Sequence, residues 1–558
     1  MAPIFLAIVA VCFQSACAQC NRTQSVLIPA EWRVKQSGTW MGWPIFESIP
    51  GKSVIDVVLE MMAYITSGEL DDVESDSVYL AVTDGSQENQ ARGAIKNYND
   101  NIGIQSNKRR IVESRIIYRR IPRTDIWFRD YLLFGINEAT GGLVTVDYDF
   151  NAWGMGGKFL ASDQKFTKVS NYFNAISKVD SQVAPKVAMT NGITTIKSWL
   201  RTEAGGFEYN DDKPAPKIGK GSSALSRKRL IVSEAVLTQP ERNFGATIYQ
   251  IRDEIKRLFR SLDDIILLPK FRFDHIAGKE IMEPPCPVTE SEARSNMSRW
   301  SQCLDSRSNY YLNQFGGGLV VDDSVFSGTI DNEDDTSRRT ALGANSSSYM
   351  NALTAIPTNG HTDEYVRWVG ENTVLLAYVP NGSEAPSRSV DGRTHFRLEK
   401  IRQTLVGRGI EIIGVPTAKD YLEYLGPGSC AYDSVFDMKF TGGTYFNNVL
   451  GKRVPAKNIP ILSIYPEGTK IPFYSARSYL NFVITDKFVL MPKYDDDTSR
   501  DRLAYDVIKR VFEIDVYRRS GINRTVVQIE NVDRLNLCGG GMHCITQNQP
   551  QSFNTQSS

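Results

Sequence analysis

The alternation of short apolar strands with amphipathic helices is the feature that most limits how this chain can fold. Three stretches have the apolar spacing of a helix, and each is followed by a strand pattern. These pairs are residues 54–65 and 78–82, 246–259 and 265–268, and 500–512 and 526–532. Strands and helices that alternate in this way cover one another's apolar faces, so the pattern predicts an α/β protein.

Two stretches interrupt this alternation and are expected to be insertions. Residues from about 274 to 356 are rich in Ser, Asn, Asp and Pro. Residues from about 380 to 470 combine a helix pattern at 399–405 with Gly- and Pro-rich loops. We expect both insertions to decorate the surface and, because long ordered loops are often functional, to shape access to a site.

The first 18 residues have the features of a secretory signal peptide. An apolar run at residues 4–13 is too short to cross a bilayer, and residues 16–18 (ACA) provide a small-residue cleavage site. Five Asn-X-Ser/Thr sequons agree with secretion, at Asn21, Asn296, Asn345, Asn381 and Asn523. We therefore predict a secreted, extracellular glycoprotein, with a buried N-terminal strand or helix as the alternative reading of the apolar run.

Net charge limits the classes of binding partner, and the cysteine content indicates how many disulfides to expect. Lys+Arg and Asp+Glu are both 64, so no net charge draws the chain toward nucleic acid or an anionic membrane. No segment after the leader approaches the roughly 18 consecutive apolar residues that a membrane helix needs. Six cysteines follow the leader, and an oxidising compartment would pair most of them. Cys286 and Cys303 are close in sequence and are the expected bridge.

A glycine-rich stretch late in the sequence predicts a nucleophile. Residues 538–550 read CGGGMHCITQNQP, so three glycines and a histidine come shortly before Cys544. Glycines let the backbone approach a ligand closely, and a cysteine on such a turn, with histidines elsewhere, is the arrangement of a catalytic thiol. The alternative is that Cys544 forms half of a disulfide, for example with Cys538.

An acidic residue near a tryptophan predicts a site for a planar cation. Residues 123–131 read RTDIWFRDY, which places Trp127 near Asp130. A carboxylate can accept a two-pronged hydrogen bond from a guanidinium group, and the indole ring offers its π face. A surface ion pair between Arg129 and Asp130 would explain the same residues without any ligand.

The sequence GHTDE at residues 360–364 predicts general acid–base chemistry. If these residues form a strand, His361 and Asp363 point to the same face. An imidazole beside a carboxylate suits both proton transfer and the binding of a cation. A His-x-Asp pair can also ligate zinc, but further ligands at a recognisable spacing are absent from the sequence, so we expect no metal.

Two further segments contain candidate substrate-binding residues. Residues 202–210 read TEAGGFEYN, where a glycine pair lets a ligand come close and Glu208 or Asn210 could touch a substrate. A turn or a bulge explains these glycines nearly as well. Asn481, within residues 478–482 (SYLNF), belongs to the same group of candidates.

Six motifs occur together in the order found in one enzyme family. They are residues 40–44 (WMGWP), 127–130 (WFRD), 150–154 (FNAWG), 203–206 (EAGG), 360–363 (GHTD) and 539–547 (GGGMHCITQ). From about residue 28 to 550, apart from the two insertions, the chain resembles the agmatine deiminase and Porphyromonas-type peptidylarginine deiminase family of the guanidine-modifying superfamily. One such motif is weak, but six in order are specific.

The resemblance implies a fold, a reaction and a role for each motif residue. The fold would be a pentein, a five-bladed α/β propeller around a narrow central site. The reaction would hydrolyse a guanidine to a ureido group and ammonia, without a metal or an organic cofactor. Cys544 would be the nucleophile and His361 the general acid/base. Asp130 and Asp363 would bind the guanidinium group, and Trp127 would line the slot.

The sequence indicates the type of reaction more clearly than it indicates the substrate. The Porphyromonas enzyme binds a C-terminal carboxylate with arginines after the Trp/Asp motif, whereas residues 149–157 contain no arginine and look more like the agmatine type. The signal peptide favours the opposite answer, because a secreted enzyme meets peptides and proteins. We therefore predict a single secreted deiminase domain over residues 19–558 that acts on peptidyl- or protein-arginine. The alternatives are an agmatine deiminase and a deiminase-fold binding protein without activity.

Overall fold

The computed structural model describes the regular core of the chain and some of its loops. The described residues are 25–44, 47–49, 52–67, 76–102, 108–151, 175–210, 228–238, 248–274, 361–380, 390–419, 421–426, 471–475, 477–494 and 498–551, with short strands and single residues between them. The predicted signal peptide and the predicted Cys286–Cys303 bridge lie outside these ranges. Within them, no helix is both long and apolar enough to cross a membrane.

Five sheets in the described part of the chain repeat one arrangement. In each sheet, an antiparallel pair of strands is extended by a strand that lies parallel to one member of the pair. A helix connects the two parallel strands, as such a crossover requires. The repeat gives a mixed α/β fold, as the alternation in the sequence predicted.

The five sheets use the following strands and connecting helices. The first has β2 (Gln36–Gly42), α2 (Ile55–Thr66), β5 (Ser77–Val82), α3 (Gly85–Asn101) and β6 (Ile116–Arg120), with β28 (Thr546–Pro550) on the other side of β2. The second has β1 (Val26–Leu27), β7 (Leu133–Asn137), β8 (Leu143–Asp147), α7 (Val183–Asn191) and β9 (Thr194–Lys197). The third has β10 (Phe207–Asn210), β11 (Arg229–Ser233), α9 (Ile248–Leu258) and β12 (Asp264–Leu268). The fourth has β18 (Val366–Trp368), β19 (Thr373–Tyr378), α13 (Val390–Gly407) and β20 (Glu411–Pro416). The fifth has β25 (Val483–Ile484), β26 (Phe488–Pro492), α15 (Thr498–Arg510) and β27 (Thr525–Ile529).

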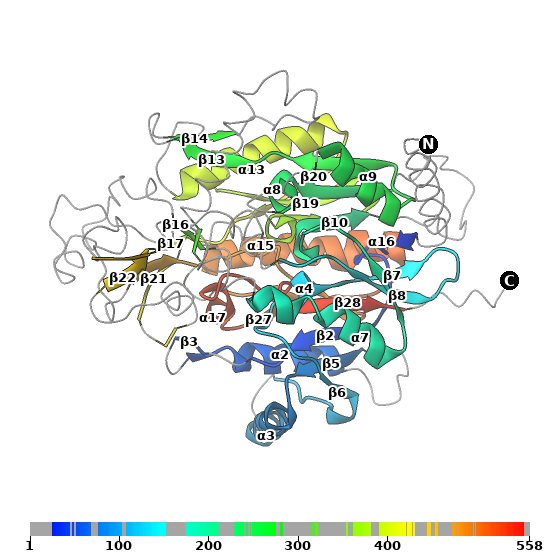
Figure 1. Ribbon diagram of the computed structural model, residues 1–558, viewed down its shortest axis with the longest axis vertical. Coiled ribbons are helices and arrows are strands. Elements are labelled where there is room, and N and C mark those ends of the chain that lie inside the picture. Colours follow the sequence, from blue (N-terminus) through cyan, green and yellow to red (C-terminus); the bar gives the residue numbers. More distant parts are fainter. Residues whose placement is uncertain are drawn as a thin grey trace, which may run out of the picture.

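Segments from opposite ends of the sequence meet in the first sheet. β28 pairs antiparallel with β2, and Thr39 lies opposite Asn548 although 509 positions separate them. Figure 1 shows the red β28 beside the blue β2 near the middle of the molecule. This pairing fixes the loop that precedes β28, and therefore Cys544, against the N-terminal sheet.

The buried apolar residues form two clusters. The larger cluster runs through the first, fourth and fifth sheets and includes Trp40, Val374 and Cys544. The smaller cluster lies between the second and third sheets and includes Val146 and Ile265. The predicted nucleophile is therefore part of a core that is shared by sheets distant in the sequence.

The element predictions agree with the structure except at one insertion boundary and at residues 361–363, which do not form a strand. The helices predicted at 54–65 and 500–512 form α2 and α15, and the strands predicted at 78–82 and 526–532 fall on β5 and β27. The second predicted insertion, about 380–470, is wrong in its first part, because α13 and β20 are the helix and the parallel strand of the fourth sheet. The Gly- and Pro-rich loops around this segment concealed its place in the repeat.

Short strands from the two predicted insertions belong to one sheet, in which both pair with the strand that follows the second insertion. β17 (Leu353–Thr354) and β21 (Leu422–Leu425) lie on either side of β24 (Ile471–Tyr474) in a separate sheet. The two stretches that interrupt the repeat in the sequence are therefore joined through β24 in the structure.

Candidate active site

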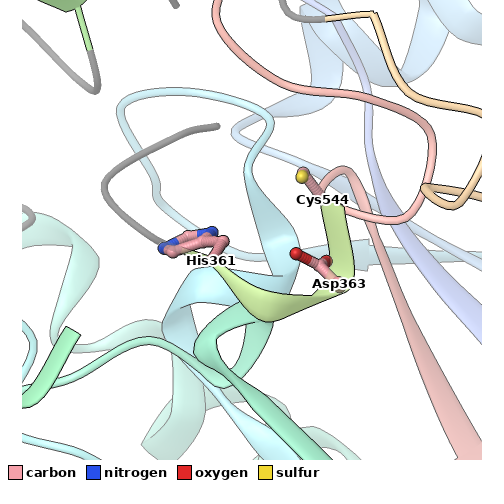
Figure 2. Close-up of side chains that lie close together, drawn as sticks. All are labelled: His361, Asp363 and Cys544. Atoms are coloured by element: carbon pink, nitrogen blue, oxygen red, sulfur yellow. The ribbon is translucent and has the colours of Figure 1, made fainter. Parts of the chain in front are cut away.

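Four short segments from distant parts of the chain meet where the predicted site residues lie. They are the helix α4 (Phe128–Tyr131), the 3₁₀ turns Ala204–Gly206 and Thr362–Glu364, and the loop 539–545 before β28. α4 contacts the first turn and β28, and the two turns contact each other. Figure 2 shows the side chains of His361, Asp363 and Cys544 brought together, with one functional atom of each within 4.8 Å of the others.

Cys544 is a free, buried thiol with two polar partners. Its sulfur lies 3.4 Å from Glu364 Oε1, to which the thiol donates, and 3.4 Å from Asn481 Nδ2, which donates to the sulfur. Cys538 is disulfide-bonded, but not to Cys544. The alternative in which Cys544 forms half of a disulfide therefore does not hold.

The thiol-bearing loop fixes the orientation of the Asn481 amide. The backbone N–H of His543 donates to Asn481 Oδ1 at 2.8 Å, so the amide nitrogen is the atom that faces the sulfur. A Cβ atom on Gly541 would lie 2.3 Å from Asn481 Oδ1, and one on Gly540 would lie 2.4 Å from the Trp127 ring. Only glycine fits at these positions. Asn481, predicted to bind substrate, is in contact with the predicted nucleophile instead.

His361 lies between two carboxylates. The strand that we considered for this segment is absent: His361 precedes the 3₁₀ turn Thr362–Glu364, and this tight turn brings His361 and Asp363 to one site. His361 Nδ1 is 3.8 Å from Asp130 Oδ1, and Nε2 is 3.6 Å from Glu203 Oε2. Burial opposes a charge on the ring, but Asp130, Glu203 and Asp363 outweigh it and raise the pKa of His361 to about 9. The imidazole is therefore a cation at neutral pH.

The EAGG motif at residues 203–206 supports this histidine. Glu203 forms a fully buried ion pair with Arg242, whose Nη2 lies 2.8 Å from Oε2. Burial raises the pKa of Glu203, but Arg242 and His361 outweigh burial and lower it, so the carboxylate is ionised. A Cβ atom on Gly205 would lie only 2.8 Å from His361 Nδ1, which explains the glycine at this position.

Asp363 is shared between the site and a second buried histidine. Its Oδ2 lies 2.6 Å from His543 Nδ1, and its Oδ1 has no hydrogen-bond partner among the described residues. Burial raises the pKa of Asp363, but His543, His361 and Arg129 together lower it. Asp363 is therefore ionised, with one oxygen engaged and the other available to a bound cation.

The carboxylates around Cys544 hold its thiol in the protonated form. Burial raises the pKa of Cys544 well above its ordinary value, and Asp363, Glu364 and Asp130 raise it further. Because the thiolate is the nucleophile, a positive charge among these carboxylates is needed before the sulfur can attack. A guanidinium group is such a charge.

Next to the site, the carboxylate of Glu31 binds side chains from two motif segments and from β18. It lies 3.1 Å from Arg129 Nη2, 2.7 Å from Arg367 Nη2 and 3.1 Å from His543 Nε2. Arg129 also donates from Nε to the carbonyl oxygen of His543 at 2.9 Å and from its backbone N–H to that of Cys544 at 3.1 Å. Arg129 is buried in this network, so a surface ion pair is not its role.

The remaining predicted residues have different surroundings. Trp127 is buried and packs on the thiol-bearing loop. Glu208 contacts Arg367 Nε at 3.0 Å, and the amide of Asn210 donates to the backbone carbonyls of residues 370 and 371 at 3.1 Å and 2.6 Å. The structure thus brings Trp127 to the site. Among the described residues, Glu208 contacts Arg367 and Asn210 contacts backbone carbonyls, rather than the thiol.

His361, Asp363 and Cys544 are residue types that also bind metals. One possible ligand atom of each lies within 4.8 Å of the others. Asp363 is already hydrogen-bonded to His543, and the thiol to Glu364. We therefore assign these residues no role as metal ligands, and the expectation of a site without metal or organic cofactor stays a prediction.

The family of the chain follows from a match that covers most of its sequence. Residues 27–275 and 333–550 match the family described as Porphyromonas-type peptidyl-arginine deiminase. This chain belongs to that family. The membership confirms the resemblance carried by the six motifs.

Solved structures agree with this family on the fold. The agmatine deiminase of Enterococcus faecalis is similar with a TM-score of 0.53 and 17% identity, over 95% of this chain and 97% of that one. The C. jejuni agmatine deiminase with substrate bound gives a TM-score of 0.51 at 15% identity, over 96% and 98%. A Porphyromonas gingivalis protein named as an arginine deiminase gives 0.50 at 16% identity, over 95% and 99%. At these identities, the likeness establishes the fold alone.

Similarity to curated proteins is local. A protein of Legionella pneumophila (strain Paris) that carries the agmatine deiminase name is 36% identical over 78 residues. That stretch covers 14% of this chain and 19% of the Legionella protein. The chain therefore matches about a fifth of that relative's length.

Five residues of this deiminase-family site were not predicted: Glu31, Glu203, Arg242, Glu364 and His543. Three of them had a local signal in the sequence, because Glu203 begins the EAGG motif, Glu364 follows Asp363 and His543 precedes Cys544. Neither Glu31 nor Arg242 is next to a chemical motif, and only the fold reveals their contacts.

Proposed function

We propose that this protein is a secreted peptidyl- or protein-arginine deiminase that hydrolyses the arginine guanidinium to the ureido group of citrulline and ammonia. One observation supports the proposal most strongly. A free thiol, a protonated imidazole and ionised carboxylates share a single buried site. Hydrolysis of a planar cation through a covalent intermediate needs this set of groups.

Substrate binding would rest on charge and orientation. Asp130 and Asp363 would hold the guanidinium and aim its central carbon at the sulfur of Cys544. Trp127, packed beside the loop, would line the slot for the planar group. The positive charge of the substrate would also offset the carboxylates that keep the thiol protonated.

The chemical steps would follow from the protonation states. The thiolate attacks the guanidinium carbon and forms a C–S bond in a tetrahedral adduct. His361, a cation in the resting site, gives its proton to the leaving nitrogen, so the C–N bond breaks and ammonia departs. The neutral His361 then takes a proton from water, whose oxygen attacks the thiouronium carbon. When the C–S bond breaks, the sulfur departs as a thiolate, and the hydroxyl proton of the adduct passes to solvent as the C=O bond of the ureido product forms.

Two lines of support bear on the substrate. The family description and the predicted leader favour an arginine residue in a peptide or protein. The names of the structural relatives favour agmatine, which is the second candidate.

Secretion is part of the proposal, and Asn523, the sequon residue within the described ranges, is exposed as glycosylation requires. We also propose that the five repeated sheets are the five blades of a pentein.

The proposal is tested by ureido-group release from agmatine, free arginine and a peptide with an internal arginine. A Cys544→Ala variant runs beside the wild type. Turnover of the peptide that disappears in the variant is the expected result. Turnover of agmatine alone would establish the second candidate. No turnover of any of the three by folded wild-type protein would contradict a deiminase and favour a binding protein.

A further inference from the structure

Among the described residues, the carboxylate of Glu364 accepts a hydrogen bond from the Cys544 thiol. Its Oε1 is 3.4 Å from the sulfur, and both side chains are almost completely buried. Glu364 is held in place from its backbone, because Ser478 Oγ donates to its carbonyl oxygen. The same segment carries Asn481, which donates to the sulfur from another direction at 3.4 Å. The thiol therefore has Glu364 as an acceptor, whereas the Asn481 amide and the Gly541 backbone donate to the sulfur.

His361 is poorly placed to take that proton. It is already protonated, with a pKa of about 9, and its two ring nitrogens face Asp130 and Glu203. Its proton is needed later by the leaving nitrogen. Of the carboxylates that surround Cys544, Asp363 has one oxygen hydrogen-bonded to His543, whereas Glu364 contacts the sulfur directly.

We propose that Glu364 is a further catalytic residue, which accepts the proton of Cys544 when the guanidinium binds. This inference rests on the proposed function. The S–H bond breaks, an O–H bond forms at Oε1, and the freed electron pair on sulfur makes the C–S bond. When the C–S bond later breaks, the departing thiolate takes the proton back from Glu364. No oxidant, metal or further reactant is involved.

The test compares Glu364→Gln with Glu364→Asp and with a control. The control is Glu254→Gln, which removes a buried carboxylate bound to Ser198 and Arg257, away from the site. The first measurement is the ultraviolet absorbance of the thiolate against pH, with the Cys544→Ala spectrum subtracted, in protein without substrate. The second is kcat for the guanidine that the wild type turns over. The charged groups that face the thiol in this titration are Glu364, Asp363, Asp130 and His361.

The two measurements should move in opposite directions in Glu364→Gln. Removal of the adjacent negative charge should lower the thiol midpoint by about one pH unit, so thiolate forms more readily in the free protein. kcat should nevertheless fall about 10²-fold, because the proton acceptor is lost. Glu364→Asp should keep the midpoint near the wild-type value and restore part of kcat.

A purely structural role would lower kcat without lowering the thiol midpoint, and that result would overturn the proposal. A Glu364→Gln variant with kcat close to the wild-type value would overturn it as well. Wild-type protein that turns over no guanidine would instead overturn the proposed function. In that case, the thiol titration still reports whether Glu364 controls the sulfur. If Glu364→Gln does not fold, an undiminished kcat in Glu364→Asp, whose shorter carboxylate withdraws from the sulfur, would count against the proposal.

Discussion

At the scale of single residues, the charge on His361 depends on neighbours that lie far away in the sequence. Burial alone would keep the imidazole neutral, yet Asp130 and Glu203 raise its pKa to about 9. Glu203 can do so because Arg242 keeps it ionised inside the protein. The acid of the proposed reaction is therefore maintained by the buried ion pair between Glu203 and Arg242.

Replacement of Glu203 by Gln should lower the pKa of His361 and narrow the pH range of activity. The alkaline limb of the kcat profile, where His361 loses its proton, should move down by about one pH unit. Steady-state kinetics between neutral and alkaline pH would measure the shift, with Glu254→Gln as the control. An unchanged alkaline limb would mean that Glu203 does not set the charge on His361.

The same carboxylates should link stability to pH through His361. Because its folded-state pKa of about 9 is above the ordinary 6.5, its stabilising contribution is fully present below pH 6.5 and is lost as the pH rises through 9. We expect the difference in unfolding free energy between the wild type and His361→Asn to shrink over this range, by about 1.4 kcal/mol per unit of pKa shift. Urea unfolding at a series of pH values would measure it, and a constant difference would contradict the raised pKa.

At the scale of elements, the glycines of the loop that carries Cys544 let this loop pack closely against Asn481 and Trp127. A methyl group on Gly541 would lie 2.3 Å from Asn481 Oδ1, so Gly541→Ala should displace Asn481 from the sulfur. A misplacement on the order of 1 Å should reduce kcat about 10²-fold. Enzyme assays and circular dichroism together would separate this effect from unfolding.

Gly93→Ala in α3 is the matched control, because a methyl group there meets no atom within 4 Å. It should leave kcat unchanged and increase the free energy of unfolding by about 1 kcal/mol, since alanine favours the helix. If Gly541→Ala also left kcat unchanged, close packing against Asn481 would not be required.

Regular elements were predictable from the sequence because their patterns are local. The apolar spacing of residues 54–65 and 500–512 reports the buried face of α2 and α15 directly. The strand expected at residues 361–363 was wrong because a 3₁₀ turn of three residues leaves no periodic pattern. His361, Asp363 and Cys544 were still predicted to share one site, because each lies in one of the six motifs.

At the scale of the whole molecule, Glu31 connects the N-terminal part of the chain to the site. It holds Arg129, Arg367 and His543, which lie 98, 336 and 512 positions away in the sequence. No local pattern encodes such contacts, so the sequence indicated the residues that meet around Cys544 better than those that hold them in place.

Glu31→Gln should therefore destabilise the fold as well as the site. Burial raises the pKa of Glu31, but Arg129, His543 and Arg367 lower it well below 4.5, so its contribution is present above that pH and is lost as the pH falls through the folded-state pKa. We expect a loss of about 2 kcal/mol at neutral pH, because the charges of Arg129 and Arg367 are left less well compensated. Denaturant unfolding would measure it, and a difference that grew in acid would have the wrong sign.

The most direct test of the whole account is the mass of the peptide that contains Cys544 after turnover is stopped by acid. The wild type, mixed with an arginine-containing peptide and quenched within one turnover, should carry an adduct on Cys544 that corresponds to the thiouronium intermediate. Cys544→Ala should carry none and should release no ureido product. Turnover that proceeds with Cys544 unmodified at every quench time, or that survives in Cys544→Ala, would contradict covalent catalysis by this thiol.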